Sequence, residues 1–404
     1  MTAIELDDFV AEAKTFLDTN AEPRAEEKFV WGEGADRVGI LDEKTPEEEA
    51  VELRAAKEWK ACEFDAGFGW ITGPVEYGGR NLPTAYERAY RELQSSYETA
   101  STQPFAVGLG MVAPTILAHA IPDVKERYLR SLYRGDLVAC QLFSEPVAGS
   151  DLAGIQTKAV RDGDEWVVNG QKVWTSSAQF SDLGEIITRT SPDKPKHKGL
   201  TMLLVDMHAP GVTVRPLRQM TGGASFNEVF FDDVRVHDSH RLGDVDEGWT
   251  VALTTLMNER AAIGGGLGGR ATSVTRFIEL ARYLGRADDP VVRQHLADAY
   301  VRTQVARYTN QRAMAKIRAG QLPGPEMSIS KLAMTQNFQT AASLLSVVLG
   351  PRLSADTGEW GTYAWSELVV GVPGFRIAGG TDEVMRNIVG ERVLGLPKEP
   401  RADA

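Results

Sequence analysis

The chain has 404 residues, with 44 Lys or Arg against 56 Asp or Glu, which gives a formal net charge of −12. A chain this acidic repels phosphate groups, which excludes general binding to nucleic acid or to an anionic membrane surface. Hydrophobic residues make up 43% and charged residues 25%, which excludes a disordered or fibrous protein.

Metal sites, membrane spans and targeting segments are not indicated by the sequence. Cys62 and Cys140 cannot build a metal cluster and the histidines show no ligand spacing, so no metal is expected. No apolar run approaches the roughly 18 residues of a membrane helix. The acidic N-terminus resembles neither a transit nor a signal peptide. We therefore expect a bacterial cytoplasmic protein that binds anionic ligands through local groups.

The first part of the chain is predicted to be helical. Thr45, Pro46 and Glu48 have the pattern of a capping box, and Pro122 and Asp123 indicate another helix start. The first helix is indicated by apolar residues that recur with the period of one helix face, at Leu6, Phe9, Val10, Ala13, Phe16 and Leu17.

The middle part is predicted to be a β domain. Hairpin turns are expected at residues 162–164 and at Asn169-Gly170. Closely spaced strands without intervening helices favour an antiparallel, barrel-like sheet over a Rossmann sheet. The strands are expected at residues 137–144, 156–161, 166–169, 171–176, 185–190, 200–205 and 228–236.

Helical periodicity returns at Gly248 and continues to about Leu394, with interruptions expected at residues 320–325 and 350–379. The prediction is therefore a multi-domain α+β protein. An N-terminal α-helical domain covers residues 1–136, a middle antiparallel β-barrel-like domain covers 137–245, and a C-terminal helical bundle covers 246–404.

A dinucleotide fingerprint in the helical part is rejected. Gly264, Gly266 and Gly269 have the G-x-G-x-x-G spacing, but that motif requires a preceding strand, which is missing here. These glycines are expected instead to let a helix approach another backbone or a flat ligand closely.

Three segments carry polar groups suited to a ligand, and each has a purely structural alternative. Residues 142–151 end a strand in a Gly/Ser turn, which either binds a polar partner or is an ordinary loop. Trp174, followed by two hydroxyl residues, is either a core aromatic or the cover of a flat cofactor. Thr381, after two glycines, either simply caps a helix or opens a pyrophosphate site.

In this order the three segments, preceded by Pro-Val-Glu-Tyr-Gly-Gly at residues 74–79, resemble the acyl-CoA dehydrogenases over about residues 65–398. The resemblance implies a helix, sheet, helix fold with FAD as cofactor and an acyl-CoA as substrate. It implies abstraction of the α-proton by a carboxylate and transfer of the β-hydrogen as hydride to flavin N5, giving the trans-2-enoyl-CoA. An electron-transferring flavoprotein would accept the electrons, and a homotetramer built on the C-terminal helices is expected.

The resemblance also implies the cofactor site. Trp174 would lie beside the flavin ring, with the Phe143 backbone and the Ser144 hydroxyl in contact with it, and Ser150 would also touch the CoA moiety. The FAD-binding residues implied are Phe143, Ser144, Gly149, Ser150, Trp174, Thr175, Ser176, Gly380, Thr381 and Glu383.

The catalytic base departs from the commonest family pattern. Many members carry a glutamate directly before the Gly-Thr of the C-terminal signature, where this chain has Gly379. A second group, which includes the isovaleryl- and long-chain-type enzymes, places it before an arginine on a helix after the β domain, which corresponds to Glu259 and Arg260.

Helix geometry supports Glu259 as the base. It falls at the edge of a predicted apolar face, where partial burial would raise its pKa and strengthen it as a base. Arg260, in the middle of that face, needs an anionic partner, either a side chain or the substrate. An ordinary salt bridge is the alternative for Glu259. The predicted face consists of Trp249, Ala252, Leu253, Leu256 and Ile263.

Several alternatives remain open at this point. Gly379 motivates a non-catalytic or partner-dependent subunit of an α2β2 assembly, and an oxidase that uses oxygen is a third possibility. Residues 281–286 depart from the family's Arg-x-x-Phe-Gly element, so the intersubunit FAD arginine is not assigned. The N-terminal segment of residues 29–42 is longer than the corresponding part of the family core, and the sequence suggests no role for it. The acyl group is undetermined, whether straight, branched or ring-bearing.

Overall fold

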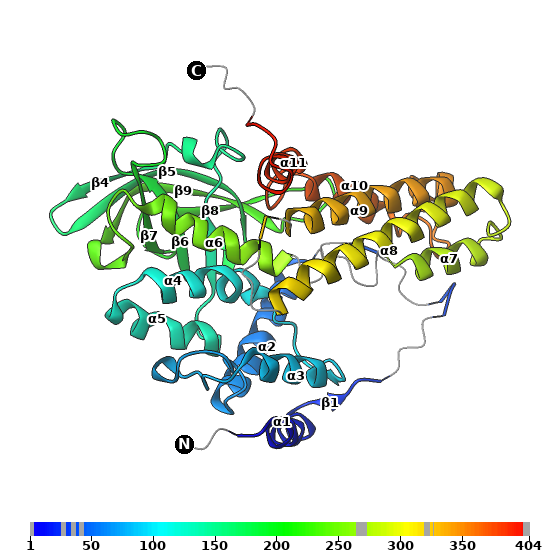
Figure 1. The fold of residues 1–404 in the computed structure, drawn as a ribbon, viewed down its shortest axis with the longest axis horizontal. Coiled ribbons are helices and arrows are strands. Elements are labelled where there is room, and N and C mark those ends of the chain that lie inside the picture. Colours follow the sequence, from blue (N-terminus) through cyan, green and yellow to red (C-terminus); the bar gives the residue numbers. More distant parts are fainter. Residues whose placement is uncertain are drawn as a thin grey trace. The chain divides into compact units, whose positions relative to one another are not determined.

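The computed structural model describes residues 4–25, 30–33, 38–39, 44–263, 273–318, 324–325 and 327–398, without the side chains of residues 260–263 and 316–318. The chain divides into two compact units (Figure 1). The first comprises Met1–Glu27, Lys44–Arg218 and Ala224–Asn258, and the second Lys28–Glu43, Gln219–Gly223 and Glu259–Ala404. Gly264, Gly266 and Gly269 lie outside the described residues.

Three helices of the first unit, which begin at Leu6, Pro46 and Pro122, start where the sequence predicts them. The Thr45 hydroxyl accepts a hydrogen bond from the Glu48 backbone N–H and the Glu48 carboxylate accepts one from the Thr45 N–H, which confirms the capping box. Phe9, Ala13 and Leu17 are fully buried. The helices are α1 (Leu6–Asn20), α2 (Pro46–Asp65), α3 (Thr84–Gln94), α4 (Ala113–His119) and α5 (Pro122–Arg134), with short turns η1 (Val75–Tyr77), η2 (Gln103–Phe105) and η3 (Gly108–Val112) and the strand pair β1 (Glu22–Pro23) and β2 (Tyr97–Glu98).

An eight-stranded sheet forms the rest of this unit, in the order β10-β7-β6-β4-β5-β9-β8 with β3 beside β6. Neighbouring strands run antiparallel except for the β3·β6 and β4·β6 pairs, which are parallel. The strands are β3 (Ala139–Leu142), β4 (Lys158–Asp162), β5 (Glu165–Ser176), β6 (Leu183–Arg189), β7 (Leu200–Asp206), β8 (Val212–Leu217), β9 (Phe226–His237) and β10 (Arg241–Leu242).

Two details of the sheet correct the sequence analysis. The turn at residues 162–164 is confirmed, but the turn at Asn169-Gly170 is wrong, because β5 runs through it with a shift of register against β9. A Cβ at Gly170 would lie 2.4 Å from the Thr157 hydroxyl oxygen, so glycine serves a close approach here. Strand β8 was not expected; it contains Pro216 and lies at the sheet edge, where proline is tolerated.

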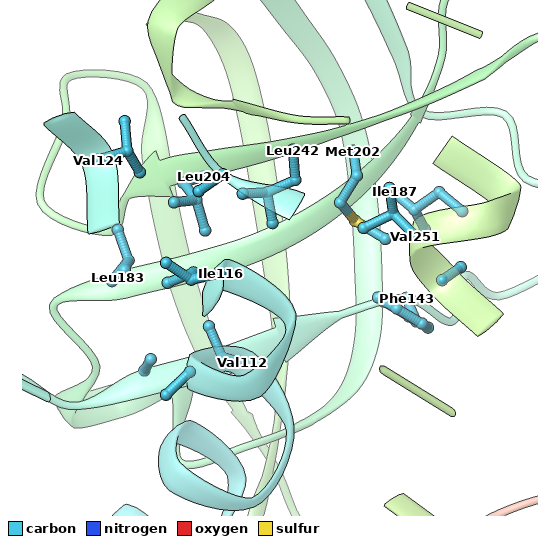
Figure 2. Packing of buried hydrophobic residues seen from close by; sticks show 14 of the residues in the cluster. Val112, Ile116, Val124, Phe143, Leu183, Ile187, Met202, Leu204, Leu242 and Val251 are labelled. Atoms are coloured by element: carbon cyan, nitrogen blue, oxygen red, sulfur yellow. The ribbon is translucent and has the colours of Figure 1, made fainter. Parts of the chain in front are cut away.

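Helices α4 and α6 (Gly248–Ile263) cover one face of this sheet. Side chains of η3, α4, β6, β7 and α6 meet there in one apolar cluster (Figure 2). A second cluster, which includes Leu142, Trp166 and Leu203, fills the opposite face. The sheet is therefore buried on both sides, and any polar side chain pointing from it into these clusters needs an internal partner.

The second unit is a helical bundle. It consists of α7 (Val274–Tyr283), α8 (Pro290–Arg318), α9 (Met327–Leu349), η7 (Gly350–Leu353), α10 (Ser366–Phe375), α11 (Asp382–Ile388) and η8 (Val389–Val393). The interruption expected over residues 350–379 is wrong for α10, which forms despite Gly371 and Pro373 because Leu368 and Val372 pack into the core. Every helix in the described part of the chain is too short or too polar to span a bilayer.

The additional N-terminal segment packs on this bundle. The ring of Trp31 lies 6.0 Å from that of Tyr283 and 5.6 Å from that of Trp360. Val38 is buried, and its N–H donates to the Ala364 carbonyl at 2.9 Å. This aromatic cluster of Trp31, Tyr283 and Trp360 thus attaches a segment for which the sequence suggested no role.

Candidate active site

A buried ion pair joins the turn after β3 to strand β5. Lys172 is fully buried, and its Nζ donates to Glu145 Oε1 at 2.9 Å and to the Phe143 carbonyl at 3.0 Å. Glu145 also accepts from the backbone N–H groups of Gln156 and Thr157. Burial opposes ionisation of Glu145, yet Lys172 and these N–H groups hold its pKa below the ordinary value. The two segments predicted to contact the flavin are therefore held together.

Neither member of this pair was proposed from the sequence. Trp166 and Val168 on β5 are buried, and Lys172 follows them by six and four residues. Strand alternation therefore places Lys172 among the buried positions. A charged residue in the alternation of a buried strand face indicates an internal partner. That signal was available, but it does not identify Glu145, 27 residues away in the chain.

Trp174 is presented to solvent by an unusual backbone. Its φ is +62°, in the left-handed region, and its side chain is 57% exposed. The pairing of β5 with β9 shifts between Lys172 and Thr175, which turns the indole away from the sheet. The core alternative for Trp174 is therefore wrong. A bulky residue held in this region costs about 1–3 kcal/mol, and such strain is concentrated at functional sites.

Next to Trp174, two buried polar atoms lack partners among the described residues. They are Thr175 Oγ1 and Asn227 Oδ1. The Asn227 amide donates to the Thr175 carbonyl, so both orphan atoms lie at the same end of β5 and β9. Ser144 and Ser176 are half-buried. An exposed indole beside unpaired polar groups fits the face and edge of a flavin ring.

The turn after β3 leaves its tip exposed. Gly149 and Ser150 are exposed, and a Cβ at Gly149 would meet no atom within 4 Å. The neighbouring Asp151 accepts from Lys196 Nζ at 2.7 Å. The Ser150 hydroxyl is thus positioned on an anchored loop and is accessible to a ligand.

In the second unit, the C-terminal signature is built around a buried carboxylate. Gly379 and Gly380 have φ values of +61° and +86°, and the Thr381 hydroxyl accepts from the Val384 N–H, which confirms the predicted N-cap. Asp382 is buried and accepts from Lys331, Thr335 and Arg376. Although burial opposes its ionisation, these donors lower its pKa. Glu383 is exposed and pairs with Arg386.

On α6, which carries the predicted base, the buried residues agree only in part with the apolar face expected from the sequence. Ala252 is fully buried and Glu259 is half-buried, but Leu253 is 41% exposed, so its assignment to the buried face is wrong. Val251 and Thr255 are buried instead, because the sheet covers α6 on a slightly different side. The side chains of Arg260 and Ile263 lie outside the description.

The predicted site residues divide between the two units. Residues 143–150 and 174–176 belong to the first, whereas Glu259, Gly380, Thr381 and Glu383 belong to the second. Hydrogen bonds from Lys172 and Val173 to the turn after β3 hold the two segments of the first group together. The roles of all these residues stay predictions.

Comparison with known proteins agrees with this fold. The chain matches the acyl-CoA dehydrogenase N-terminal domain over residues 5–136, the middle domain over 140–234 and the C-terminal domain over 246–394. The order of helices, sheet and helical bundle is thus the three-domain fold of a class of flavin-dependent dehydrogenases. The chain belongs to the acyl-CoA dehydrogenase family and is an FAD-dependent enzyme.

Individual relatives cover nearly the whole chain. It is 37% identical to the acyl-CoA dehydrogenase IpdE1 of Mycobacterium tuberculosis, over 88% of this chain and 91% of that protein. It is 35% identical to IpdE1 of Mycolicibacterium smegmatis, over 98% and 99%. Among solved structures, the Tcur3481-Tcur3483 steroid ACAD aligns with a TM-score of 0.75 at 26% identity, over 98% of this chain and 98% of that chain. The ChsE4-ChsE5 complex of M. tuberculosis aligns with a TM-score of 0.72 at 27% identity, over 99% of this chain and 100% of that chain.

Proposed function

We propose that the enzyme desaturates an acyl-CoA between Cα and Cβ, with Glu259 as the base. The observation that carries this proposal is the half-buried carboxylate of Glu259 on α6, in a chain where Gly379 provides no side chain at the alternative position. Partial burial favours the neutral form of a carboxyl group and so strengthens the carboxylate as a proton acceptor.

In the proposed reaction, the Glu259 carboxylate takes the α-proton while the β-hydrogen leaves with its electron pair, and the Cα–Cβ single bond becomes double. Bound FAD supplies the hydride acceptor. Phe143, Ser144 and Trp174 would hold the flavin ring, with Thr175 and Ser176 at its edge. Gly149 and Ser150 would bind the cofactor and CoA from the turn, and Gly380, Thr381 and Glu383 would bind FAD from the C-terminal side. Arg260 would contact the substrate.

The acyl group is proposed to carry a ring system. The support is the similarity of this chain to the Tcur3481-Tcur3483 steroid ACAD. An absorbance screen of flavin reduction with straight, branched and ring-bearing acyl-CoAs tests it. Fastest reduction by a straight-chain acyl-CoA would contradict the proposal.

Glu259→Gln tests the base. The variant keeps the size and polarity of the side chain but cannot accept a proton, so it should purify with FAD and lose at least about a hundredfold in the rate of flavin reduction. The matched control is Glu279→Gln, which removes an exposed carboxylate from α7 and should react like the parent. A normal rate in Glu259→Gln would exclude Glu259 as the base.

A partner-dependent subunit is the second candidate, favoured by Gly379 and by the description of the ChsE4-ChsE5 structure as a complex. The proposed enzyme binds one FAD per chain when purified alone, as a homotetramer. A chain that is empty alone and binds FAD only with a related chain would support an α2β2 assembly. An electron-transferring flavoprotein is the proposed acceptor, and peroxide released in its absence would indicate an oxidase.

A further inference from the structure

A fully buried carboxyl group lies inside the apolar cluster between the sheet and helices α4 and α6. Glu185 is in the middle of β6 and has no exposed surface. Leu183 and Ile187, two residues away on either side, share its sheet face and belong to that cluster. Its Oε1 lies 2.7 Å from the Thr255 hydroxyl of α6, and its Oε2 has no partner among the described residues.

Counting hydrogens along this contact shows which form of Glu185 fits. Thr115 Oγ1 lies 2.8 Å from the Met111 carbonyl and 3.0 Å from Thr255 Oγ1. With the Thr255–Glu185 contact this makes three contacts of 3.0 Å or less, while a fourth, from Thr255 Oγ1 to the Val251 carbonyl, is longer at 3.4 Å. The two threonines supply only two hydroxyl hydrogens for the three short contacts. All three contacts become hydrogen bonds only if Glu185 carries the third hydrogen. The chain then runs from Glu185 to Thr255, from Thr255 to Thr115, and from Thr115 to Met111.

The surroundings provide no opposite charge that would favour the ionised form. Within their described bounds, η3, β3, α6 up to Asn258 and β7 up to Val205 contain no charged residue. The other titratable groups on the adjoining elements include Cys140 on β3, where burial also favours the neutral form, and Glu259, one turn beyond Thr255 on α6. The remaining ones are His119, which contacts Thr254, Arg189 at the far end of β6, Asp206 at the end of β7, and Arg241 on β10, which pairs with Asp238. Burial accordingly raises the pKa of Glu185 to about 8, although the Thr255 hydroxyl opposes this.

We propose that Glu185 is a positioning residue that is protonated at neutral pH and donates a hydrogen bond to Thr255, thereby holding α6 against the β domain. Ionisation of Glu185 removes this hydrogen bond and places an unpaired charge in the apolar cluster. Thr255 precedes Glu259 by four residues, about one turn of the same helix. The effect on catalysis rests on the proposed function of Glu259, whereas the effect on protonation and stability does not.

The sign of the pH dependence follows from the direction of the shift. The folded protein binds this proton more tightly than the unfolded chain, so the stability it contributes is complete below the ordinary carboxyl pKa. That contribution declines as the pH rises and is lost by about pH 8. If only the protonated form positions α6, the flavin reduction rate is about tenfold lower at pH 9 than at pH 7.

Glu185→Gln tests this inference, because glutamine can donate to Thr255 and stays neutral at every pH. Infrared difference spectra of the FAD-loaded parent minus the variant should contain the band of a protonated carboxyl group at pH 7, lost with a midpoint near pH 8. The midpoint of thermal unfolding should fall with pH more steeply in the parent than in Glu185→Gln. The variant should also retain its reduction rate at pH 9.

Two further variants on α6 serve as controls. Thr255→Val removes the acceptor and should shift the carboxyl band, while Thr254→Val, which contacts His119, should leave the band and the pH profile unchanged. Absence of a protonated band at pH 7, or equal pH dependence of unfolding in the parent and Glu185→Gln, would overturn the proposal. If only the rate effect fails, the link to Glu259 is wrong while the protonation of Glu185 stands.

Discussion

Trp174 and Lys172 show at the scale of single residues how one strand serves two purposes. Lys172 is buried and fixes the turn after β3, whereas Trp174, two residues later, is exposed in a strained conformation. Strand alternation alone would place both side chains on the same face. The register shift between them separates their environments, so the same segment contributes to stability and presents an aromatic ring.

Trp174→Gly separates the effect of backbone strain at this position on stability from the effect of the indole on FAD binding. Glycine accepts a positive φ, so loss of strain should leave the free energy of unfolding of the apoprotein unchanged or higher by about 1 kcal/mol. Loss of the indole should weaken FAD binding by about tenfold, the equivalent of one aromatic contact. Urea unfolding and FAD titration measure the two effects.

The core residue Trp166 provides the control, since Trp166→Ala should lower the free energy of unfolding by about 3–5 kcal/mol. If Trp174→Gly destabilises the apoprotein as much as Trp166→Ala does, the strain argument fails. If it binds FAD like the parent, the indole does not contact the flavin.

At the scale of elements, local sequence predicted where helices begin better than it predicted how far helices and strands extend. The capping box at Thr45 and the cap at Thr381 were found because their signals lie within four residues of each other. Helix α10, strand β8 and the unbroken β5 were missed because glycine and proline inside them resemble local breaks. Packing of Leu368 and pairing of β5 with β9 override those preferences.

The segment containing Trp31 is the element whose role only the structure reveals. Trp31→Ala removes the ring contacts with Tyr283 and Trp360 and should lower the stability of the second unit by about 1–3 kcal/mol. Thermal unfolding measures this effect. Trp31→Phe, which retains an aromatic ring, should recover at least half of the loss. Unchanged unfolding in Trp31→Ala would mean that other contacts attach the segment.

At the scale of the whole molecule, the exposed surface of α8 bears on assembly. Val301, Val305 and Tyr308 are all more than half exposed and follow one another at helical spacing along one face. Exposed apolar stripes of this kind commonly mark contacts between subunits. The expected homotetramer, or an assembly with a related chain, would bury this stripe.

Val301→Lys combined with Val305→Lys should therefore yield smaller particles in light scattering after size-exclusion chromatography, with unchanged far-UV circular dichroism. Two lysines introduced into a buried apolar contact are costly to desolvate. Gln311→Lys, which is exposed on α8 about a quarter turn away from the stripe, should assemble like the parent. A double variant of unchanged mass would place the interface elsewhere.

The sequence by itself determined the order of helices, sheet and bundle, the family, the FAD requirement and the replacement of a glutamate by Gly379. These follow from local periodicity and from motifs confined to short segments. Tertiary structure alone decided that Trp174 is exposed, that Lys172 pairs with Glu145, and that Glu185 meets Thr255. The reason is physical: burial and pairing depend on which distant segment covers a residue, and Glu185 and Thr255 are 70 positions apart in the chain.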